Sequence, residues 1–292
     1  MLNKITTLIS NDGQEHWDTI ITPQKKWYEF RLGEIWHARE LLGLFVWRDL
    51  ISVYKQTILG PFWYFLQPTL QALMYFFIFV SIARLPTDGI PALVFYLAGT
   101  ILWGFFSSNI SRVSTTFIGN TYLYGKIYFP RLVIPISLVI SNFISFLIQG
   151  LLLIAVMLIY ISIGSAIRPN MWLFILPLLL LIIAFLGFSF GIIVSALTVR
   201  YRDLQYFVGF GVQFLLYGTP IIYPLSAIPN SFRVLILLNP LTSVFEAYRY
   251  ALLGKGSINL PLLAYSFLLT AILFFLSLII FNRVEDTFMD FV

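Results

Sequence analysis

The chain has 292 residues, of which 59% are hydrophobic and 11% are charged, and its formal net charge is +5 at pH 7. Soluble domains carry about 25% charged residues, so this composition excludes a soluble globular protein and indicates an all-α integral membrane protein. The absence of cysteine excludes a disulfide framework, and two histidines are too few to predict a metal centre. The positive charges lie mostly in predicted loops, which fits control of membrane topology better than nucleic-acid binding.

The N-terminal part is polar. Residues 1–32 show neither a periodic apolar pattern nor a secretory apolar core, so we expect a cytoplasmic lead. From Gly33 to Trp47, apolar side chains recur at three- to four-residue steps, which predicts an amphipathic helix too short and too charged to cross a bilayer, and residues 33–60 are assigned to this interfacial helix region. Four of the seven tryptophans precede Gly60, as is typical of a segment at the lipid interface. A helix packed on a soluble partner is the alternative.

Long apolar stretches dominate the rest of the chain. A hydrocarbon core about 30 Å thick needs roughly 20 helical residues, and six stretches are taken as spans. They lie at 62–83, 91–111, 132–162, 171–198, 205–222 and 259–281. If the N-terminus is inside, thirteen Lys and Arg residues fall on the inner side and five on the outer side, which predicts two cytoplasmic termini.

The segment between the fifth and sixth spans, residues 223–258, holds two apolar pieces that are each too short to cross. Asn239-Pro240 separates them, because proline disfavours helix in the residue before it. One interpretation is a pair of short re-entrant helices beside a pore, and the other is a flat helical cap on the outer surface. Glu246 and Arg249 are spaced to pair on the second piece, as a surface ion pair of small energetic value.

An energy source is missing from the chain. The nearest approach to a phosphate-binding P-loop is Gly125-Lys126, which is followed by Ile127 rather than Ser or Thr. No GxSxG motif occurs, and the centres of the spans lack the ionisable residues of a proton or ion relay. We therefore predict a transport subunit that is not an enzyme and that draws its energy from a partner protein.

Two predicted inner loops combine Arg or Lys with tyrosine, at residues 120–135 and 198–206. Aromatic and Arg side chains are favoured anchors at protein interfaces, so these loops are candidates for docking a soluble partner. The alternative is that their arginines only fix topology.

Aromatic residues make up 18% of the chain. Most of these residues are expected to face lipid or to pack against other helices. The first two spans, however, contain more aromatic residues than an interfacial belt needs. Because aromatic faces can slide along sugar rings, the surplus residues are candidates for a channel wall. The candidates for a channel wall are Trp63, Tyr64, Tyr75, Phe76, Phe79, Trp103 and Phe106, with Tyr96 and Phe105 beside them. In the fourth span, Gly187 and Gly191 form a GxxxG motif that permits close helix approach.

Six sequence blocks occur in a characteristic order. They are Trp36 with Arg39-Glu40-Leu41, RDLISVYKQTILGPFWYFLQP at 48–68, PTDGIP at 86–91, KIYFPRL at 126–132, VRYRD at 199–203, and TPIIYPLSAIP followed by LNPLTSVFEAYR. Together they resemble the membrane subunits of ABC-2 type exporters of O-antigen, capsule or teichoic-acid polysaccharides. One departure is Val53, where that family usually has Arg.

The resemblance implies a homodimeric permease in a bacterial inner or plasma membrane, paired with two copies of a separate ATPase that binds ATP and Mg. The chain itself would bind no cofactor and would move a lipid-linked polysaccharide outward, with residues 61–292 as its ABC-2 transmembrane domain. Residues implied in ATPase contact and coupling are Arg48, Asp49, Tyr54, Lys55, Gln56, Tyr128, Pro130, Arg131, Arg200, Arg202 and Asp203. Those implied at the outer re-entrant region are Tyr223, Pro224, Asn239, Pro240, Glu246 and Arg249, and the hinge before the first span is Gly60-Pro61.

Two other functions remain open at this point. An ABC-2 exporter of small hydrophobic molecules or drugs would share the fold. A membrane-embedded glycan polymerase or ligase belongs to another class, and it typically needs a large outer loop with catalytic charges. Here the predicted outer loops hold only Asp88 and Glu246 as acids.

Overall fold

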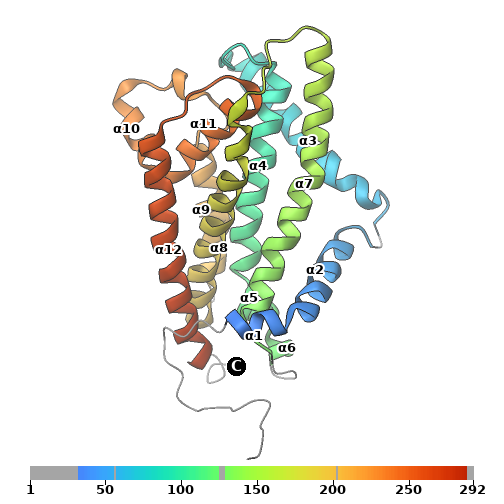
Figure 1. The fold of residues 1–292 in the computed structure, drawn as a ribbon, viewed down its shortest axis with the longest axis vertical. Helices are drawn as coiled ribbons and strands as arrows, with labels where there is room; N and C mark the ends of the chain where they lie inside the picture. The colour runs from blue at the N-terminus through green and yellow to red at the C-terminus, as the bar shows by residue number, and fades with distance from the viewer. Residues whose placement is uncertain (1–31, 56, 125–128, 202, 288–292) are drawn as a thin grey trace, which may run out of the picture.

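A computed structural model describes residues 32–55, 57–124, 129–201 and 203–287. All regular structure in these residues is helical, and the long helices stand roughly side by side along the longest axis of the molecule (Figure 1). The first described helix and the end of the last one lie at the same end of the bundle (Figure 1). Most of the predicted N-terminal lead, residues 1–31, is outside the described residues.

At the position of the predicted amphipathic interfacial helix, the chain forms two consecutive helices, α1 (Leu32–His37) and α2 (Arg39–Tyr54), and their place at a lipid interface stays a prediction. They lie across the lower end of the bundle, where α2 packs against α7 (Figure 1). Phe45 and Val46 are buried on the packed side, whereas Trp36 and Trp47 are exposed. Apolar side chains therefore occupy both the packed side and the outer side of this segment.

Within the described residues, five helical segments have the length and apolarity to cross a membrane: Gly60–Ile82, Ala92–Val113, Val133–Ser162, Met171–Arg200 and Leu260–Val284. Each begins and ends within about three residues of a predicted span, so five of the six spans are confirmed. The chain is a multi-pass membrane protein. The elements are η1 (Gly60–Phe62), α3 (Trp63–Tyr75), η2 (Phe76–Ile82), α4 (Ala92–Val113), α7 (Val133–Ser162), η3 (Met171–Ile175), α8 (Leu176–Arg200) and α12 (Leu260–Thr287).

The predicted fifth span is shorter than expected. Its helix α9 (Leu204–Tyr217) has 14 residues, which corresponds to about 21 Å of helix and is less than the thickness of a hydrocarbon core. The helix ends before Thr219-Pro220, since proline lacks an N–H donor and excludes helical geometry from its predecessor. Two short helices, α5 (Thr116–Gly119) and α6 (Thr121–Tyr124), lie at the lower end after α4 (Figure 1).

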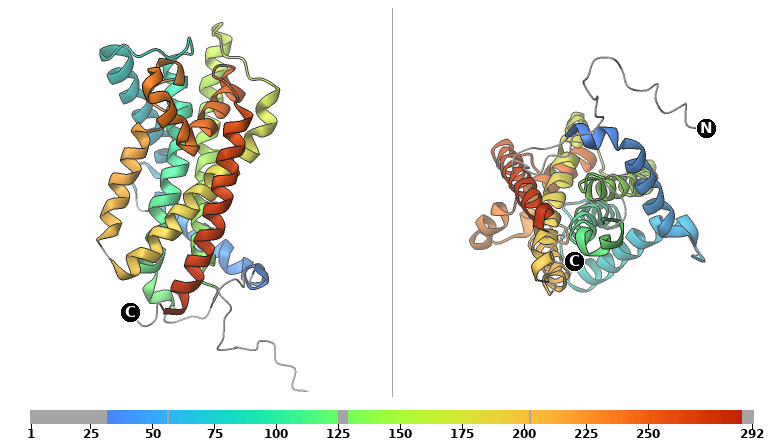
Figure 2. Two further views of the ribbon diagram at one scale, coloured as in Figure 1. Left: turned by 90° about the vertical axis from the view of Figure 1, so that its left-hand side faces the viewer. Right: turned by 90° about the horizontal axis from the view of Figure 1, so that it is seen from below.

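Helix α4 is the centre of the bundle. It packs against α3, α7, α8, α9 and α11, and the view from below shows it near the middle of the bundle (Figure 2, right). The closest approach is to α8, where a methyl group at Gly187 would lie 2.8 Å from Cβ of Asn109 and one at Gly191 would lie 2.6 Å from Cβ of Val113. Both distances are shorter than real Cβ contacts, so the two glycines of the GxxxG motif allow this contact.

The outer segment contains η4 (Leu225–Ala227), α10 (Asn230–Leu238) and α11 (Pro240–Leu253). The predicted break at Asn239-Pro240 is confirmed: the side chain of Asn239 accepts a hydrogen bond from the N–H of Leu241 and so caps α11. Helix α11 packs against α4, α8 and α12, whereas α10 buries none of its residues. The two helices therefore do not form a flat cap, because α11 belongs to the bundle and only α10 lies on the outside (Figure 1).

Candidate functional site

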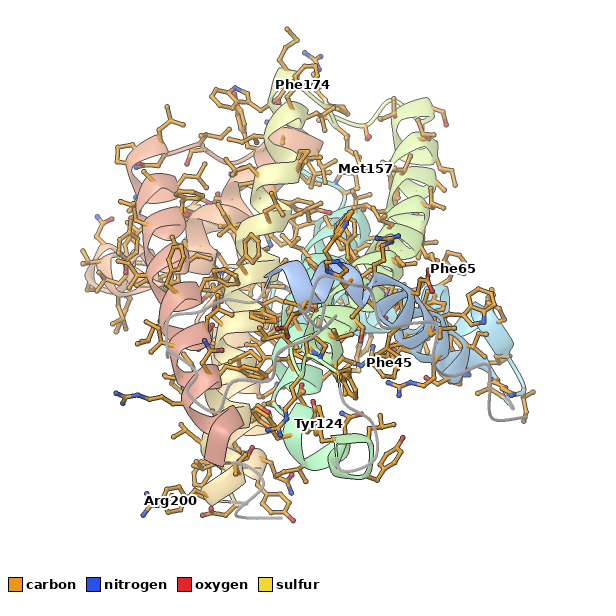
Figure 3. All side chains as sticks on the ribbon, turned by 60° about the horizontal axis from the view of Figure 1, so that its bottom comes forward. Phe45, Phe65, Tyr124, Met157, Phe174 and Arg200 are labelled. Carbon is orange, nitrogen blue, oxygen red and sulfur yellow. The ribbon has the colours of Figure 1, made fainter. Side chains whose placement is uncertain are left out.

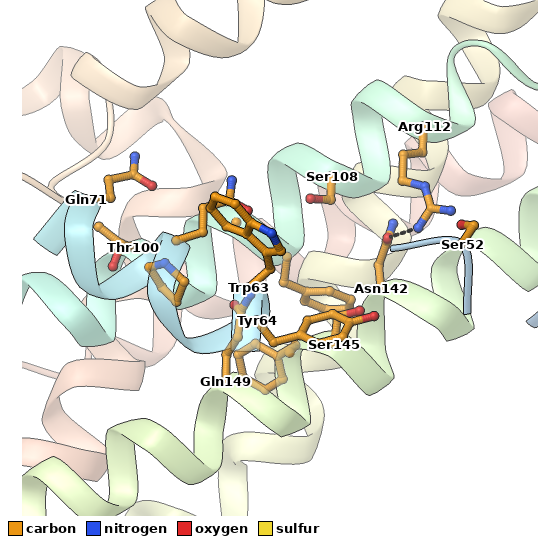
Figure 4. Close-up of a pocket in the computed structure, with 15 residues that line it drawn as sticks. Ser52, Trp63, Tyr64, Gln71, Thr100, Ser108, Arg112, Asn142, Ser145 and Gln149 are labelled. Atoms are coloured by element: carbon orange, nitrogen blue, oxygen red, sulfur yellow. Dashed lines mark hydrogen bonds between the residues drawn. The ribbon is translucent and has the colours of Figure 1, made fainter. Parts of the chain in front are cut away.

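A cavity of about 470 Å³ opens between α2, α3, α4 and α7, and its walls combine polar groups with aromatic and other apolar surface (Figure 4). Thr100, Gly104, Ser108 and Arg112 line it from α4 at four-residue spacing, which places them on one face of that helix. The other walls are supplied by Ser52 of α2, by Trp63, Tyr64, Gln67, Pro68 and Gln71 of α3, and by Asn142, Ser145 and Gln149 of α7.

A polar network closes the lower end of this cavity. The Arg112 guanidinium donates to Oδ1 of Asn142 at 2.8 Å, and the Asn142 amide donates to Oδ1 of Asn109 at 2.8 Å. Asp49 of α2 completes it, with Oδ2 3.6 Å from Arg112 and Oδ1 2.9 Å from Arg48. This network joins α2 to α4 and α7 through charged and amide groups inside an apolar bundle.

The sequence interpretation missed three members of this network: Asn109, Arg112 and Asn142. From the sequence, Arg112 is only one of the inner-side charges, and the two asparagines are isolated polar residues within apolar spans. The available signal was spacing, because Thr100, Ser108 and Arg112 recur on one helical face. A polar stripe of this kind inside an apolar span is rare and marks a functional or structural site.

Asp49 does not lie where a contact with a partner protein requires it. It is 6% exposed, and its carboxylate faces Arg112 rather than the molecular surface. Burial of Asp49 speaks for coupling through the bundle more than for direct contact with an ATPase, and its role in coupling stays a prediction. Its position indicates that it anchors α2 on the bundle.

Replacing Asp49 by asparagine is expected to loosen α2. The change removes the charge opposite Arg112, and we expect a loss of about 1–2 kcal/mol because the Arg112 side chain stays partly exposed. Amide hydrogen exchange in α2 should become faster while exchange in α12 stays unchanged. The matched control is Glu40→Gln, an exposed acid on the same helix. Equal exchange in Asp49→Asn and the unmodified protein would contradict the anchoring role.

The first inner loop lies under α2. The Phe129 ring is 5.9 Å from the Phe45 ring of α2 and 5.8 Å from the Tyr124 ring of α6, measured between centroids. The Arg131 guanidinium lies 5.7 Å from the centroid of Tyr124, and Pro130 is half-buried beside it. The structure thus brings the predicted first contact loop and the N-terminal helix together.

The second inner loop lies at the same end of the molecule (Figure 3). Arg200 and Asp203 are exposed there, and the Arg200 guanidinium lies 5.5 Å from the ring centroid of Tyr201. On the N-terminal side, Arg48 is partly exposed and Lys55 is exposed. Among the other predicted contact residues, Gln56, Tyr128 and Arg202 fall outside the described residues, as does the side chain of Tyr54.

The predicted channel wall needs correction. Trp103 and Phe106 are 5% and 0% exposed and pack against each other in the core, so neither can line an open channel in this structure. The neighbouring Tyr96 and Phe105 are buried as well, and so are Tyr64 and Tyr75 on α3. Tyr75 and Tyr96 pack around the central helix, whereas Tyr64 and Phe105 also contribute to the lining of the cavity. Among the predicted wall residues, those with exposed surface are Trp63 and Phe76, with Phe79 partly buried.

The outer ion pair is buried, in contrast to the predicted surface pair. Arg249 and Glu246 are 2% and 7% exposed, with Nη1 of Arg249 3.7 Å from Oε1 of Glu246. Arg249 also donates to the carbonyl of Ile221 at 2.8 Å, and its guanidinium lies 3.9 Å from the ring centroid of Phe95. Burial raises the pKa of the Glu246 carboxyl and lowers the pKa of Arg249 to about 10, and their mutual attraction opposes both shifts.

The remaining outer residues hold the connection between α9 and α11. The Asn239 amide donates to the carbonyl of Gly218 at 3.0 Å and to Oγ1 of Thr219 at 2.9 Å. The Tyr223 hydroxyl donates to the carbonyl of Tyr217 at 2.6 Å, and Pro224 is buried. These bonds fix the ends of α9 and α11 against each other.

Between α2 and the first span, Gly60 has φ = +53°, in the left-handed region that glycine adopts without a steric penalty. A methyl group there would meet no heavy atom within 4 Å, so backbone conformation and not space requires glycine. Pro61 follows in the first turn of η1, where its missing N–H costs nothing. The pair forms a sharp corner, and its use as a hinge stays a prediction.

Comparison with known proteins gives a consistent result. Residues 40–253 match the protein family described as ABC-2 type transporter. The chain is 31% identical over 252 residues to an O-antigen export system permease protein RfbA of Klebsiella pneumoniae, which covers 86% of this chain and 94% of that relative. It is also 31% identical over 218 residues to an O-antigen export system permease protein RfbA of Myxococcus xanthus, which covers 74% of this chain and 81% of that relative.

Proposed function

We propose, from the premise that this chain belongs to the ABC-2 type transporter family, that it is the permease subunit of an ATP-driven exporter of a lipid-linked polysaccharide of the O-antigen, capsule or teichoic-acid type. The observation that carries the proposal is the 31% identity to O-antigen export permeases over 86% of the chain. The five long apolar helices and the lack of a P-loop in the sequence agree with a transport subunit powered from outside.

The proposed topology places both termini in the cytoplasm of a bacterial inner or plasma membrane. The excess of Lys and Arg on the side of the N-terminus supports this orientation. Helix α9, with the irregular residues 218–224 above it, would make the sixth crossing. That irregular backbone is hydrogen-bonded to Asn239 and Arg249, as non-helical backbone at membrane depth must be.

The proposed partner is an ABC ATPase that binds ATP and Mg and docks at the lower end of the molecule. Charged groups with exposed surface support this placement: Arg200 and Asp203 of the second inner loop and the half-buried Arg131 of the first lie at that end, and Arg48 and Lys55 lie on the α2 segment that rises from it (Figure 1). Asp49 and Arg112 would then transmit movement of α2 to α4 and α7. Two permease and two ATPase copies per complex are the proposed stoichiometry.

The exported chain is proposed to pass between two permease copies. Support comes from the outward-facing aromatic residues of α9, which no described helix covers and which line up along one face: Tyr206, Phe207, Phe210, Phe214 and Tyr217. The exposed rings of Trp63 and Phe76 on the first span would contribute from the other copy. The outer helix α10 would lie at the mouth of this path.

Cells that lack the chain provide the test. We expect lipid-linked glycan to accumulate on the cytoplasmic side and surface polysaccharide to disappear, because synthesis continues while export stops. Extraction of undecaprenyl-linked glycan and immunoblotting of surface polysaccharide measure the two quantities. Re-expression of the unmodified chain is the control. Unchanged surface polysaccharide together with altered drug resistance would instead support an exporter of small hydrophobic molecules.

A further inference from the structure

The cavity between α2, α3, α4 and α7 has no role in the function proposed so far. Its volume of about 470 Å³ lies within the range of about 300–1,000 Å³ that is common for small-molecule sites. It lies between segments that are otherwise apolar enough to span a membrane, where polar side chains are rare and are kept for a purpose. The polar groups facing it come mainly from Gln67, Gln71, Ser108, Asn142, Ser145 and Gln149.

The chemical groups that line the cavity indicate which class of ligand it can bind. The amides and hydroxyls are neutral donors and acceptors. Arg112 is the charged residue of the lining; its guanidinium bonds Asn142 and lies 3.6 Å from Asp49, whose carboxylate also pairs with Arg48. The other polar groups of the lining are neutral, and they outnumber this one charge. A wholly apolar molecule would leave the amides unpaired, at a cost for each one.

Aromatic rings lie among these amides. Trp63, Tyr64, Phe105 and Phe146 all contribute to the lining. Neutral hydrogen-bonding groups beside aromatic faces match a sugar ring, whose hydroxyl edge bonds to amides while its C–H face packs on an aromatic ring. Figure 4 shows Trp63, Tyr64, Ser145 and Gln149 gathered around one part of the cavity.

A second observation also indicates an absent polar partner. Tyr64 contributes to the lining, and its hydroxyl has almost no accessible surface and no hydrogen-bond partner in the described part of the chain. Tyr64 as a whole is 8% exposed, so bulk solvent does not satisfy this group. Buried polar groups without partners are uncommon, and a bound molecule or water usually explains them.

We propose that this cavity is a binding site for neutral sugar residues of the exported glycan, formed within a single permease copy. The proposal rests on the proposed function and adds a place where the substrate is held. Ser52 brings α2 into the wall, and the Asp49–Arg112 pair lies at the lower end. Binding of sugar is thereby linked to the position of α2, the helix proposed to receive the movement of the ATPase.

The natural absence of cysteine makes a direct test possible. Ser145→Cys places one thiol in the cavity, and Ser162→Cys places one at an exposed position near the other end of the same helix. Each variant, in complex with its ATPase in lipid nanodiscs, is labelled with 2-aminoethyl methanethiosulfonate. The probe is the oligosaccharide that mild acid releases from the surface polysaccharide of the organism that encodes the chain. At roughly ten times its Kd, this oligosaccharide should slow labelling at position 145 about tenfold, because only the unoccupied site reacts. Labelling at position 162 should not change.

A second variant tests the role of the amides. Gln149→Met keeps the size of the side chain and removes its hydrogen-bonding group, and position 149 is only partly buried, so folding should be little affected. Introduced into the Ser145→Cys protein, it should weaken protection by the oligosaccharide about three- to tenfold. Gln213→Met on α9, an exposed glutamine that does not line this cavity, is the matched control and should leave protection unchanged.

Two outcomes would overturn the inference. Protection of position 145 by inorganic pyrophosphate but not by the oligosaccharide would show a phosphate site. Equal labelling with and without either compound would show that the cavity holds only water. The proposed function fails by a different observation, namely unchanged surface polysaccharide in cells that lack the chain. If export depends on the chain while labelling is unprotected, the proposed function survives and the sugar site does not.

Discussion

Arg249→Met should lower the free energy of unfolding by about 3–5 kcal/mol, because it leaves the carboxylate of Glu246 buried without its ion-pair partner. The substitution also removes the hydrogen bond to the carbonyl of Ile221 and the contact with the ring of Phe95. Thermal unfolding in detergent, followed by size-exclusion chromatography of the protein that remains folded, measures the loss.

A double-mutant cycle separates the charge from the packing. Glu246→Gln combined with Arg249→Met should be more stable than Arg249→Met alone, since no buried carboxylate then remains unpaired. Arg233→Met, on the exposed side of α10, is the matched control and should change stability by less than about 0.5 kcal/mol. If Glu246→Gln and Arg249→Met changed the free energy of unfolding additively, the two residues would not be a coupled buried pair.

The same variant has an expected dependence on pH. Burial raises the pKa of Glu246 in the folded state, so its protonated form is favoured there. Without Arg249 this preference becomes stronger. Below the pKa of the unfolded carboxyl, both states are protonated and the cost of the lone charge disappears; as pH rises through the folded pKa, the cost appears in full. The Arg249→Met protein should therefore be closest to the unmodified protein in acid.

The double substitution Gly187→Ala with Gly191→Ala has the second largest expected effect. Each new methyl group would lie within 2.8 Å of a side-chain carbon of α4, at Asn109 and Val113, so α4 and α8 must move apart. Overpacking of this kind costs about 1–3 kcal/mol at each site. It also displaces Asn109, which accepts the hydrogen bond of Asn142 in the network that holds α2.

The sign of the effect makes this prediction specific. In a helix without close neighbours, Gly→Ala stabilises by about 0.5–1 kcal/mol, because alanine has the higher helix propensity. Gly150 of α7 has no heavy atom within 4 Å of a built methyl group, so Gly150→Ala is the matched control and should be neutral or stabilising. The same detergent unfolding assay compares the variants. A stabilised Gly187→Ala, Gly191→Ala protein would refute the close α4–α8 contact.

Local signals account for what the sequence predicted well. Hydropathy located five spans within about three residues of the helices found, because a run of roughly 20 apolar residues has few alternatives to a membrane helix. Asn239-Pro240 predicted the boundary between α10 and α11 for an equally local reason, since proline excludes its predecessor from a helix. The fifth span was predicted too long because apolar residues continue past Tyr217, where the helix itself ends.

The candidate site could be predicted only in part. Blocks of sequence identified the inner loops and the N-terminal helix, and the structure places these segments at one end of the molecule. They did not reveal that Asp49 faces inward, nor that Arg112, Asn109 and Asn142 join it. These residues are far apart in the chain, and their contacts depend on how α2, α4 and α7 are oriented about their own axes.

By itself, the sequence determined the membrane class, the five long spans, the break before α11 and the resemblance to a transporter family. Tertiary structure alone decided which faces of the helices are buried: it placed Trp103 and Phe106 in the core, Glu246 and Arg249 inside the protein, and a polar cavity beside α2. The physical reason is that lipid is as apolar as a protein core. Hydropathy therefore finds the helices of a membrane protein but does not distinguish the side that meets protein from the side that meets lipid.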